Sequence, residues 1–498
     1  MLINASRSRD ILECIASLSS DEVATPPAVA NQVLDLLPVE VWSNKDLKWL
    51  DPACKTGVFL REAARRLMEG LNDSMPDEAE RRKHIFTNML HGYALTELTA
   101  QMSRRSVYYN KDASNKKLAV VPFKTSAGNI TFSGSDHDYK QSGKCTKCGA
   151  GKEDFGAPGN RERHAYDFIH EKEAQMRFDV VIGNPPYQLE SGGFGVQATP
   201  IYNLFVEQAF KLRPRYVAMI IPSRWFSGGM GLDGFRERML ASRNFRFLVD
   251  YPDATLLFPG IDLSGGACYF LWDSSYNGPC EITGVTATGT SAPMKRFLNE
   301  HGNVLVRFNE AIEIIKKVKT KTGNSSLAPS VSAINPFQLA TNFTDYRSEP
   351  FPGSVALHTK NGTGFVAREK VGTGLELIGK WKVLLSKAYG ERGAFPYLVI
   401  GKPVILAPDS CCTMTYIVAG TFNSKVEADN FASFLKTKLV RFLVLMRKST
   451  QDISKKSFTD VPVLDWKITW TDEKIFAHFQ INQDEVNYIS SLVRPIDA

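Results

Sequence analysis

The tetrapeptide Asn184-Pro185-Pro186-Tyr187 follows an apolar run, FDVVIG, at 178–183. The run predicts a buried strand, and ligands of open α/β sheets bind beyond the carboxyl ends of the strands. An asparagine amide oxygen and a rigid backbone carbonyl can both accept hydrogen bonds from an exocyclic amino group, while the tyrosine ring stacks on a planar base. These contacts would free the nitrogen lone pair to attack an electrophilic methyl group. The alternative is a proline-fixed turn after a strand.

A second candidate lies at the first predicted strand-to-helix turn, DPACKTG at 51–57. An apolar run precedes Asp51, and the segment LREAARRLMEGL after the turn has helical spacing. Small residues at such a turn let a cofactor approach the backbone, and Glu97, after the next predicted strand, could bind ribose hydroxyls. The GxGxxG dinucleotide fingerprint and the P-loop are absent from the sequence, which disfavours NAD and ATP.

The elements that would position these residues alternate over the first 300 residues. Alternating strands and helices predict an α/β fold with a mainly parallel sheet and helices on both faces. Residues 105–165 are polar and rich in Gly, Lys and Ser, which predicts an insertion with a hairpin and loops. Further strands are predicted at 118–123, 216–222 and 245–251, and helices at 77–90, 202–212 and 233–242.

The alternation stops near residue 300, where turn-punctuated strand-like stretches begin and a helical stretch at 424–446 follows. Two domains are therefore predicted, 1–300 and 301–498. Residues 301–460 hold 22 Lys/Arg against 12 Asp/Glu, whereas 1–300 balance at 35 against 35. A local basic excess suits a polyanionic partner, because phosphate contacts supply most non-specific affinity for nucleic acid. The alternative is an ordinary solvated surface.

Taken together, the motifs resemble the gamma-class N6-adenine DNA methyltransferases of restriction-modification systems, over roughly residues 20–280 in motif order. The resemblance implies a Rossmann-like class I S-adenosylmethionine-dependent methyltransferase fold, followed by a mixed α+β target-recognition domain. Asn184-Pro185-Pro186-Tyr187 would then be the catalytic loop, with Tyr187 receiving a flipped adenine. Phe258, in LFPG, falls where a second aromatic ring would pack against the base, or else in the core.

The resemblance also implies a cofactor site for S-adenosylmethionine. Thr25-Pro26-Pro27 resembles the family's extra cofactor motif, and DPACKTGVF resembles its usual loop DPACGSGxF. Lys55 stands where glycine is usual, and a non-glycine residue resists positive φ. Three features of the family's cofactor site carry over onto matching positions of this sequence: the loop, the acidic residue that binds the ribose, and the pair of residues that contacts the adenine of the cofactor. These cofactor residues are Thr25, Pro26, Asp51, Ala53, Gly57, Glu97, Asp167 and Phe168.

Cys145 and Cys148 form the one close CxxC pair among eight cysteines. With His137 before the pair and His164 after it, they predict a four-ligand structural zinc site. His170 is also near in sequence, but it lies three positions after Asp167, in the segment assigned to the cofactor. The alternative is a reduced, solvent-exposed thiol pair.

For the basic segment, the resemblance implies a domain that reads base edges in the major groove. The loop SKAYGERGAF at 386–395 is the preferred candidate for DNA contact. Candidates for phosphate contact are Lys360, Arg368, Lys370, Lys382, Lys387, Arg392, Arg447, Lys448, Lys455 and Lys456.

The function expected is site-specific methylation of adenine N6 in double-stranded DNA, as part of a restriction-modification or related defence system. One alternative is methylation of RNA or of a protein amide, because NPPY also occurs in enzymes of those kinds. Another is a methylase subunit that needs a separate specificity or nuclease partner. No convincing PD…(D/E)xK arrangement is found, so a cognate restriction endonuclease would be a separate partner. The N-terminus MLINASRSRD lacks a secretory profile and no apolar run is long enough to span a bilayer, so a cytoplasmic, bacterial or phage-encoded protein without membrane contact is expected.

Overall fold

The computed structural model divides the chain into two compact units, Met1–Leu305 and Val306–Ala498. The division falls five residues after the end of the predicted first domain. The residues that the structure describes are 24–132, 137–149, 151–152, 166–170, 176–189, 199–261, 263–323, 325–389, 395–448 and 452–496.

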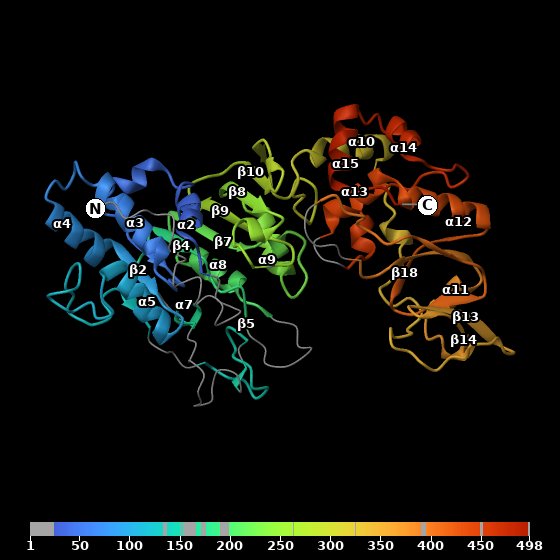
Figure 1. The fold of residues 1–498 in the computed structure, drawn as a ribbon, viewed down its shortest axis with the longest axis horizontal. Helices are drawn as coiled ribbons and strands as arrows, with labels where there is room; N and C mark the ends of the chain where they lie inside the picture. Colours follow the sequence, from blue (N-terminus) through green and yellow to red (C-terminus); the bar gives the residue numbers. More distant parts are fainter. Residues whose placement is uncertain are drawn as a thin grey trace. The chain divides into compact units, whose positions relative to one another are not determined.

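The first unit is built on one large, mainly parallel sheet (Figure 1). Its strands follow the order β11-β10-β8-β9-β7-β4-β1-β2-β3, with β12 paired to β10. β9 runs antiparallel between β7 and β8, and β11 and β12 are antiparallel to β10. This is the Rossmann-like methyltransferase fold that the sequence predicts. The strands are β1 (Trp49–Asp51), β2 (Leu90–Tyr93), β3 (Ile130–Thr131), β4 (Val180–Gly183), β7 (Tyr216–Pro222), β8 (Phe245–Tyr251), β9 (Ala267–Asp273), β10 (Cys280–Thr286), β11 (Gly289–Thr290) and β12 (Met294–Arg296).

The strand order reverses between β1 and β4, because β1 leads to β2 on one side and β4 leads to β7 on the other. Right-handed crossovers in opposite directions place the connecting helices on opposite faces of the sheet. The point of reversal is where open α/β sheets bind ligands. The helices of this unit are α2 (Pro27–Leu34), α3 (Val58–Gly70), α4 (Glu78–His84), α5 (Glu97–Tyr108), α7 (Asp167–His170), α8 (Tyr202–Lys211) and α9 (Asp233–Ala241).

The central strands explain the apolar runs of the sequence. All seven residues of β7 and all four of β4 are buried, as in a parallel sheet that is covered on both faces. Because neither face meets water, these strands show no alternation of polar and apolar residues. The same property made FDVVIG and YVAMIIP recognisable as strands.

The predicted strand at 118–123 is wrong. This segment forms turns, in which Val120 N donates to Tyr108 O at 2.9 Å and Phe123 N donates to Ala113 O at 2.8 Å. The Phe123 ring packs on Tyr108, with ring centroids 4.7 Å apart, so its apolar side chains anchor a loop to the core. The third strand, β3, lies later and inside the predicted insertion 105–165. The insertion is therefore shorter than predicted. A two-stranded pair, β5 (Gln188–Leu189) and β6 (Thr199–Pro200), follows the catalytic loop.

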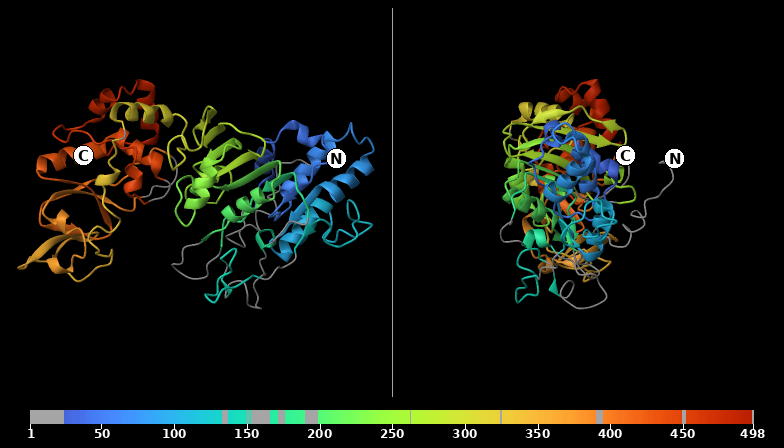
Figure 2. Two further views of the ribbon diagram at one scale, coloured as in Figure 1. Left: turned by 180° about the vertical axis from the view of Figure 1, so that it is seen from behind. Right: turned by 90° about the vertical axis from the view of Figure 1, so that its left-hand side faces the viewer.

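The second unit is mixed α+β, as predicted. It contains two three-stranded sheets, ordered β14-β13-β17 and β16-β15-β18. Within the unit, α10, α14 and α15 gather on one side and β13 and β14 on the other (Figures 1 and 2). Its strands are β13 (Ser354–Thr359), β14 (Gly362–Ala367), β15 (Trp381–Ser386), β16 (Val404–Leu406), β17 (Ser410–Cys412) and β18 (Tyr416–Phe422), and its helices are α10 (Ala311–Thr322), α11 (Leu375–Ile378), α12 (Lys425–Lys436), α13 (Lys438–Arg447), α14 (Asp472–His478) and α15 (Gln483–Leu492).

The single helix predicted at 424–446 is two helices. Thr437 lies between α12 and α13 with φ −63° and ψ 146°, an extended conformation that ends the first helix and begins the second. The apolar periodicity continues across this break, which is why the pattern suggested one helix. Among the described residues, no helix has both the length and the apolar character that crossing a membrane requires.

Candidate active site

The first contact in the candidate site joins the predicted catalytic loop, residues 184–187, to the N-terminal motif Thr25-Pro26-Pro27. Asn184 follows β4 directly, and its side-chain amide Nδ2 donates to Thr25 Oγ1 at 3.1 Å. Both residues are buried, with Asn184 only 2% exposed. Thr25 lies just before Pro27, the first residue of α2. Two motifs separated by 159 residues in sequence thus meet at one buried hydrogen bond.

The second contact joins the predicted catalytic loop to the predicted cofactor loop, DPACKTG at 51–57. Asp51 ends β1 and Gly183 ends β4, the two strands between which the sheet order reverses. Gly183 has φ +151°, and a Cβ atom placed there would lie 2.7 Å from Asp51 Oδ1. The same oxygen accepts a hydrogen bond from Ala53 N at 3.1 Å. Only glycine allows this close approach, so the two predicted loops form one site.

The Asp51 carboxyl group has an unusual environment. Burial raises its pKa to about 7, although the Ala53 N–H and the positive charge of Lys55 oppose this shift. Transfer of a carboxylate out of water disfavours its charged form. A cationic ligand would supply the counter-charge that the buried carboxylate needs.

Lys55 connects the two loops in a way that the sequence did not suggest. It adopts φ +31°, so the position keeps the positive φ for which the family's usual glycine is suited. Its Nζ lies 5.9 Å from the centroid of the Tyr187 ring, within range of a cation–π contact. The sequence signal for this contact was that Lys55 stands where the family usually has glycine.

Tyr187 is the aromatic residue of the catalytic loop and is 6% exposed. Its backbone carbonyl accepts a hydrogen bond from Ile201 N at 3.2 Å, which fixes the loop beside α8. Burial raises the pKa of the phenol, so the ring stays neutral at physiological pH. A neutral, flat ring at the carboxyl end of β4 is the surface on which a base could stack.

The rest of the cofactor loop is held between β1, β2 and α5. Cys54 N donates to Tyr93 O at 2.9 Å, which ties the loop to the end of β2. Gly57 precedes α3 with φ +76°, and a Cβ there would lie 2.7 Å from Ser103 Oγ of α5. Glycine therefore brings the start of α3 close to α5. This is the tight turn that the motif predicts.

Glu97 lies at the first position of α5, after the capping residue Thr96. Its side chain is exposed, and its carboxylate accepts a hydrogen bond from Gln101 Nε2 at 3.3 Å. A carboxylate in the first turn is favoured by the helix dipole. The structure thus places the predicted ribose-binding acid a few residues beyond the end of β2.

Asp167 and Phe168 begin the one-turn helix α7 and are both buried. The Phe168 ring stacks on Phe205 of α8 at 5.9 Å and lies 6.1 Å from the ring of Tyr93, at the end of β2. These contacts dock α7 between α8 and the carboxyl edge of the sheet. Phe168 is thus held at the same edge as the cofactor loop.

Phe258 is 2% exposed and belongs to the core of the first unit. This is the core position that the sequence left open as an alternative. A role against the flipped base stays a prediction.

A further buried contact was not foreseen. Ser223, which follows β7, donates its hydroxyl to Asp250 Oδ1 of β8 at 2.7 Å, and both residues are about 1% exposed. The pair joins two strands that are separated by β9. The available signal was a single acidic residue in the strand FRFLVDY.

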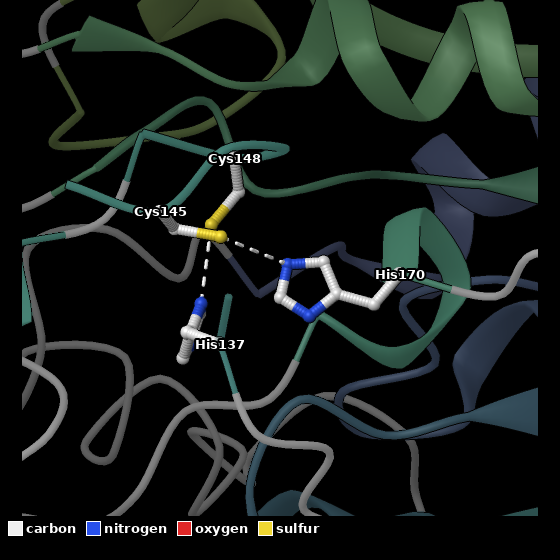
Figure 3. Close-up of side chains that lie close together, drawn as sticks. All are labelled: His137, Cys145, Cys148 and His170. Carbon is white, nitrogen blue, oxygen red and sulfur yellow. Dashed lines mark hydrogen bonds between the residues drawn. The ribbon is translucent and has the colours of Figure 1, made fainter. Parts of the chain in front are cut away.

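The cysteine pair of the insertion lies in a cluster of four possible metal ligands (Figure 3). His137, Cys145 and Cys148 belong to the cluster as predicted, and its fourth member among the described residues is His170. His164 lies outside the described residues. Asp167 and His170 occupy the first and last positions of α7, so one helical turn carries both a predicted cofactor residue and a cluster residue.

Three of the ten proposed phosphate contacts have internal roles instead. Lys382 is fully buried, and its Nζ donates to the carbonyls of Leu377, Ile378 and Lys380 at the end of α11. Burial lowers the pKa of Lys382 to about 8. Residue type and local charge do not reveal such burial, which explains the error.

The other two also satisfy partners within the unit. Arg447 is buried and forms two hydrogen bonds with the Asp460 carboxylate. Lys448 Nζ donates to the Val399 carbonyl at 2.7 Å and to that of Tyr389. Arg392 lies outside the described residues, together with the rest of 390–394 in the loop 386–395. The candidates that remain exposed are Lys360, Arg368, Lys370, Lys455 and Lys456, and Lys387 is half-buried.

Comparison with known proteins bears on this site. The family model of Eco57I restriction-modification methylases matches residues 88–258, which include the catalytic loop. An uncharacterized adenine-specific methylase of Mycoplasma pneumoniae (strain ATCC 29342 / M129 / Subtype 1) is 37% identical over 299 residues, covering 54% of this chain and 71% of the relative. The chain belongs to this family of adenine-specific restriction-modification methylases. Membership implies the use of S-adenosylmethionine.

One solved structure supports the fold of this methylase. A nuclease-deletion mutant of the Type ISP restriction-modification enzyme LlaGI, in complex with a DNA substrate mimic, has a TM-score of 0.51 and 11% identity, covering 90% of this chain and 47% of that one. A modification subunit of a putative type I restriction enzyme from Vibrio vulnificus YJ016 has a TM-score of 0.33 and 19% identity, covering 56% and 50%. The methylase spans about half the length of these proteins.

The close approach of Gly183 to Asp51 gives a first testable expectation. Gly183→Ala should destabilise the first unit by about 1–3 kcal/mol through overpacking, beyond the cost of its positive φ. Gly289→Ala is the matched control, because Gly289 has φ +138° and no atom within 4 Å of a Cβ. Urea unfolding and S-adenosylmethionine titration would compare the two variants. Equal losses of stability and affinity would contradict the contact between the loops.

Proposed function

We propose that the protein transfers a methyl group from S-adenosylmethionine to the N6 amino group of an adenine flipped out of double-stranded DNA. The observation that carries this proposal is the joining of three motifs at the reversal point of the sheet. Asn184 contacts Thr25 of the N-terminal motif, and Gly183 packs on Asp51 of the cofactor loop. Family membership supplies the base that is modified.

The residues fit the cofactor at its cationic end and along the strand edge. Asp51 offers a buried carboxylate, whose negative charge the sulfonium of bound S-adenosylmethionine, the methyl donor, would balance. Gly183 lets the loop after β4 approach Asp51, and Gly57 lets the start of α3 approach α5. Glu97 would hold the ribose hydroxyls, and Asp167 and Phe168 the adenine of the cofactor.

The catalytic loop would act by positioning and by hydrogen bonding. The side-chain oxygen of Asn184 would accept a hydrogen bond from one N–H of the adenine amino group. The backbone carbonyl of Pro185 would accept a hydrogen bond from the other N–H. Hydrogen bonds to both N–H groups favour a pyramidal nitrogen, which takes the lone pair out of conjugation with the ring and directs it at the methyl donor. Pro185 and Pro186 restrict the backbone, which keeps the acceptors in place before the base arrives.

Tyr187 would receive the base in its flipped position. Extrusion from the duplex costs a few kcal/mol, and stacking on an aromatic ring offsets about 1–3 kcal/mol of it. The high pKa of the phenol keeps the ring neutral. No covalent enzyme intermediate is required, because the amino nitrogen would attack the methyl carbon directly while the bond from that carbon to sulfur breaks and the sulfur leaves as a neutral thioether. The nitrogen would release its proton to solvent or a nearby base.

The second unit would bind the DNA. Its exposed basic residues include Lys455 and Lys456, at the start of the short turn Lys455–Phe458. Neutralising phosphates releases condensed counterions, so affinity should fall steeply with salt. A separate restriction endonuclease would cut the unmodified site.

Replacing both Lys455 and Lys456 by alanine should weaken DNA binding about equally for all sequences and lower the salt slope by about 1–2. The matched control is Lys116→Ala with Lys117→Ala, another exposed neighbouring pair, in the first unit. Fluorescence anisotropy across a salt series measures both slopes. An unchanged slope in the first variant would remove this turn from the DNA-binding surface.

The proposed reaction is tested with radiolabelled S-adenosylmethionine and the full chain. Unmethylated bacterial DNA, total RNA and a cell extract of protein would be offered separately, and the labelled nucleoside would be identified by mass spectrometry. We expect label in DNA as N6-methyladenine. Label in RNA or protein, or on cytosine, would overturn the proposed substrate.

A further inference from the structure

The cluster of His137, Cys145, Cys148 and His170 has the composition and compactness of a metal site. Its four ligand atoms all lie within 4.8 Å of one another. Cys148 Sγ lies 3.2 Å from His137 Nδ1, and Cys145 Sγ lies 3.7 Å from His170 Nε2. In a tetrahedral zinc site, with Zn–S of about 2.3 Å and Zn–N of about 2.0–2.1 Å, sulfur and nitrogen are about 3.5 Å apart. The two measured distances bracket that value.

The local backbone is shaped to present the thiols. The insertion forms a small hairpin in which Tyr139 pairs antiparallel with Cys145, and Gly149, with φ +76°, donates its N–H to the Cys145 carbonyl at 3.1 Å. The backbone N–H groups of Lys147 and Cys148 also point at Cys145 Sγ. Amide donors around a sulfur stabilise a thiolate, which is the form that binds metal.

The surroundings separate this cluster from an exposed thiol pair. Cys145 and Cys148 are only 4% and 3% exposed, while the two histidines are half-buried. The four side chains converge on one another in Figure 3, from the hairpin and from α7. Two thiols and two imidazoles are the donors that zinc prefers, and four protein ligands leave no open position for catalysis.

We propose that these four residues bind a structural zinc ion that clamps the insertion hairpin to α7 and thereby holds the cofactor residues Asp167 and Phe168 in place. The part that concerns the cofactor rests on the proposed function. α7 has four residues, too few to form a stable helix by itself. His170, at its last position, would be fixed by the metal, while Phe168 is fixed by packing on α8. Removal of the metal would release one of these two attachments.

The metal is tested first, without cofactor. Elemental analysis of the purified full chain should find about one zinc ion per chain, and cobalt substitution should give the visible bands of a tetrahedral ion with two thiolates. His170→Ala and Cys148→Ser should lose the metal. His164→Ala should keep it, because the proposed ligands are His137, Cys145, Cys148 and His170, and this variant tests the ligand set that the sequence predicted instead. Metal-free wild-type protein, or loss of metal only in His164→Ala, would overturn the site.

The clamp is tested by cofactor affinity in the same variants. His170→Ala should bind S-adenosylmethionine about tenfold more weakly, in line with losses at residues that orient a site, whereas His164→Ala should bind it normally. Circular dichroism would show that both variants are folded. Normal affinity in a zinc-free His170→Ala would refute the clamp but leave the metal site. Failure of the wild type to bind S-adenosylmethionine, with zinc present, would contradict the proposed function instead.

Discussion

Asn184→Ala should lower kcat for methyl transfer by about a hundredfold to a thousandfold, the usual cost of removing one hydrogen-bonding group that stabilises a transition state. The side-chain oxygen of Asn184 would be lost as an acceptor for the adenine amino group. Cofactor affinity should change little, since Asp51 and the rest of the cofactor loop remain. Single-turnover rates and S-adenosylmethionine titration measure the two effects separately.

The same change removes a buried hydrogen bond. Thr25 Oγ1 loses the donor that lies at 3.1 Å, which should cost about 1–3 kcal/mol of stability. Asn129→Ala is the matched control, because the Asn129 amide donates to the carbonyls of Phe86, Thr87 and Leu90, away from the catalytic loop. It should lose stability but keep its rate. A similar fall in kcat in both variants would show that the loss at Asn184 is structural.

The second large effect concerns pH. Burial raises the pKa of Asp51 to about 7, so this group is neutral below that value and charged above it. Only the charged form attracts a sulfonium cation. Affinity for S-adenosylmethionine should therefore fall by up to about tenfold per pH unit below pH 7. Asp51→Asn should bind weakly at every pH and show a flatter profile. An identical profile in Asp51→Asn would contradict a role for this carboxylate.

The free energy of unfolding should change with pH in the direction opposite to cofactor affinity. The pKa of Asp51 in the folded state lies above its ordinary value of 3.8. The contribution of Asp51 to the free energy of unfolding is therefore complete below pH 3.8 and is lost as the pH rises through 7. At pH 8 and without cofactor, Asp51→Asn should be more stable than the wild type by up to about 4 kcal/mol. Lys55→Gln should move the midpoint of cofactor binding above pH 7, because Lys55 lowers the pKa of Asp51. Thermal melting and titration across pH check both expectations.

The sequence predicted the architecture where local pattern and burial agree. FDVVIG and YVAMIIP are apolar because both faces of the sheet are covered, and this made β4 and β7 recognisable. The loops after β1 and β4 could be placed at one edge, because parallel strands share their carboxyl ends. The strand order, with β9 antiparallel between β7 and β8, depends on contacts that no local pattern encodes.

The errors have the same origin. Residues 118–123 have the composition of a strand, but packing of Phe123 on Tyr108 makes them a loop. Lys382 looked like a phosphate contact, yet three backbone carbonyls hold its ammonium group inside the unit. The membership of His170 in the cysteine cluster could not be predicted from spacing, since His170 lies on α7, a separate element from the segment that carries the cysteines. In each case a tertiary contact decided the outcome.

The central claim is that the two loops at the reversal point of the sheet methylate adenine in DNA. Long-read sequencing of DNA from a methylation-deficient bacterium that expresses the protein tests it most directly, with Asn184→Ala as the control. We predict one short sequence motif that carries N6-methyladenine in the wild type and none in the variant. Soluble wild-type protein that binds S-adenosylmethionine, but leaves no modified motif, would contradict the claim.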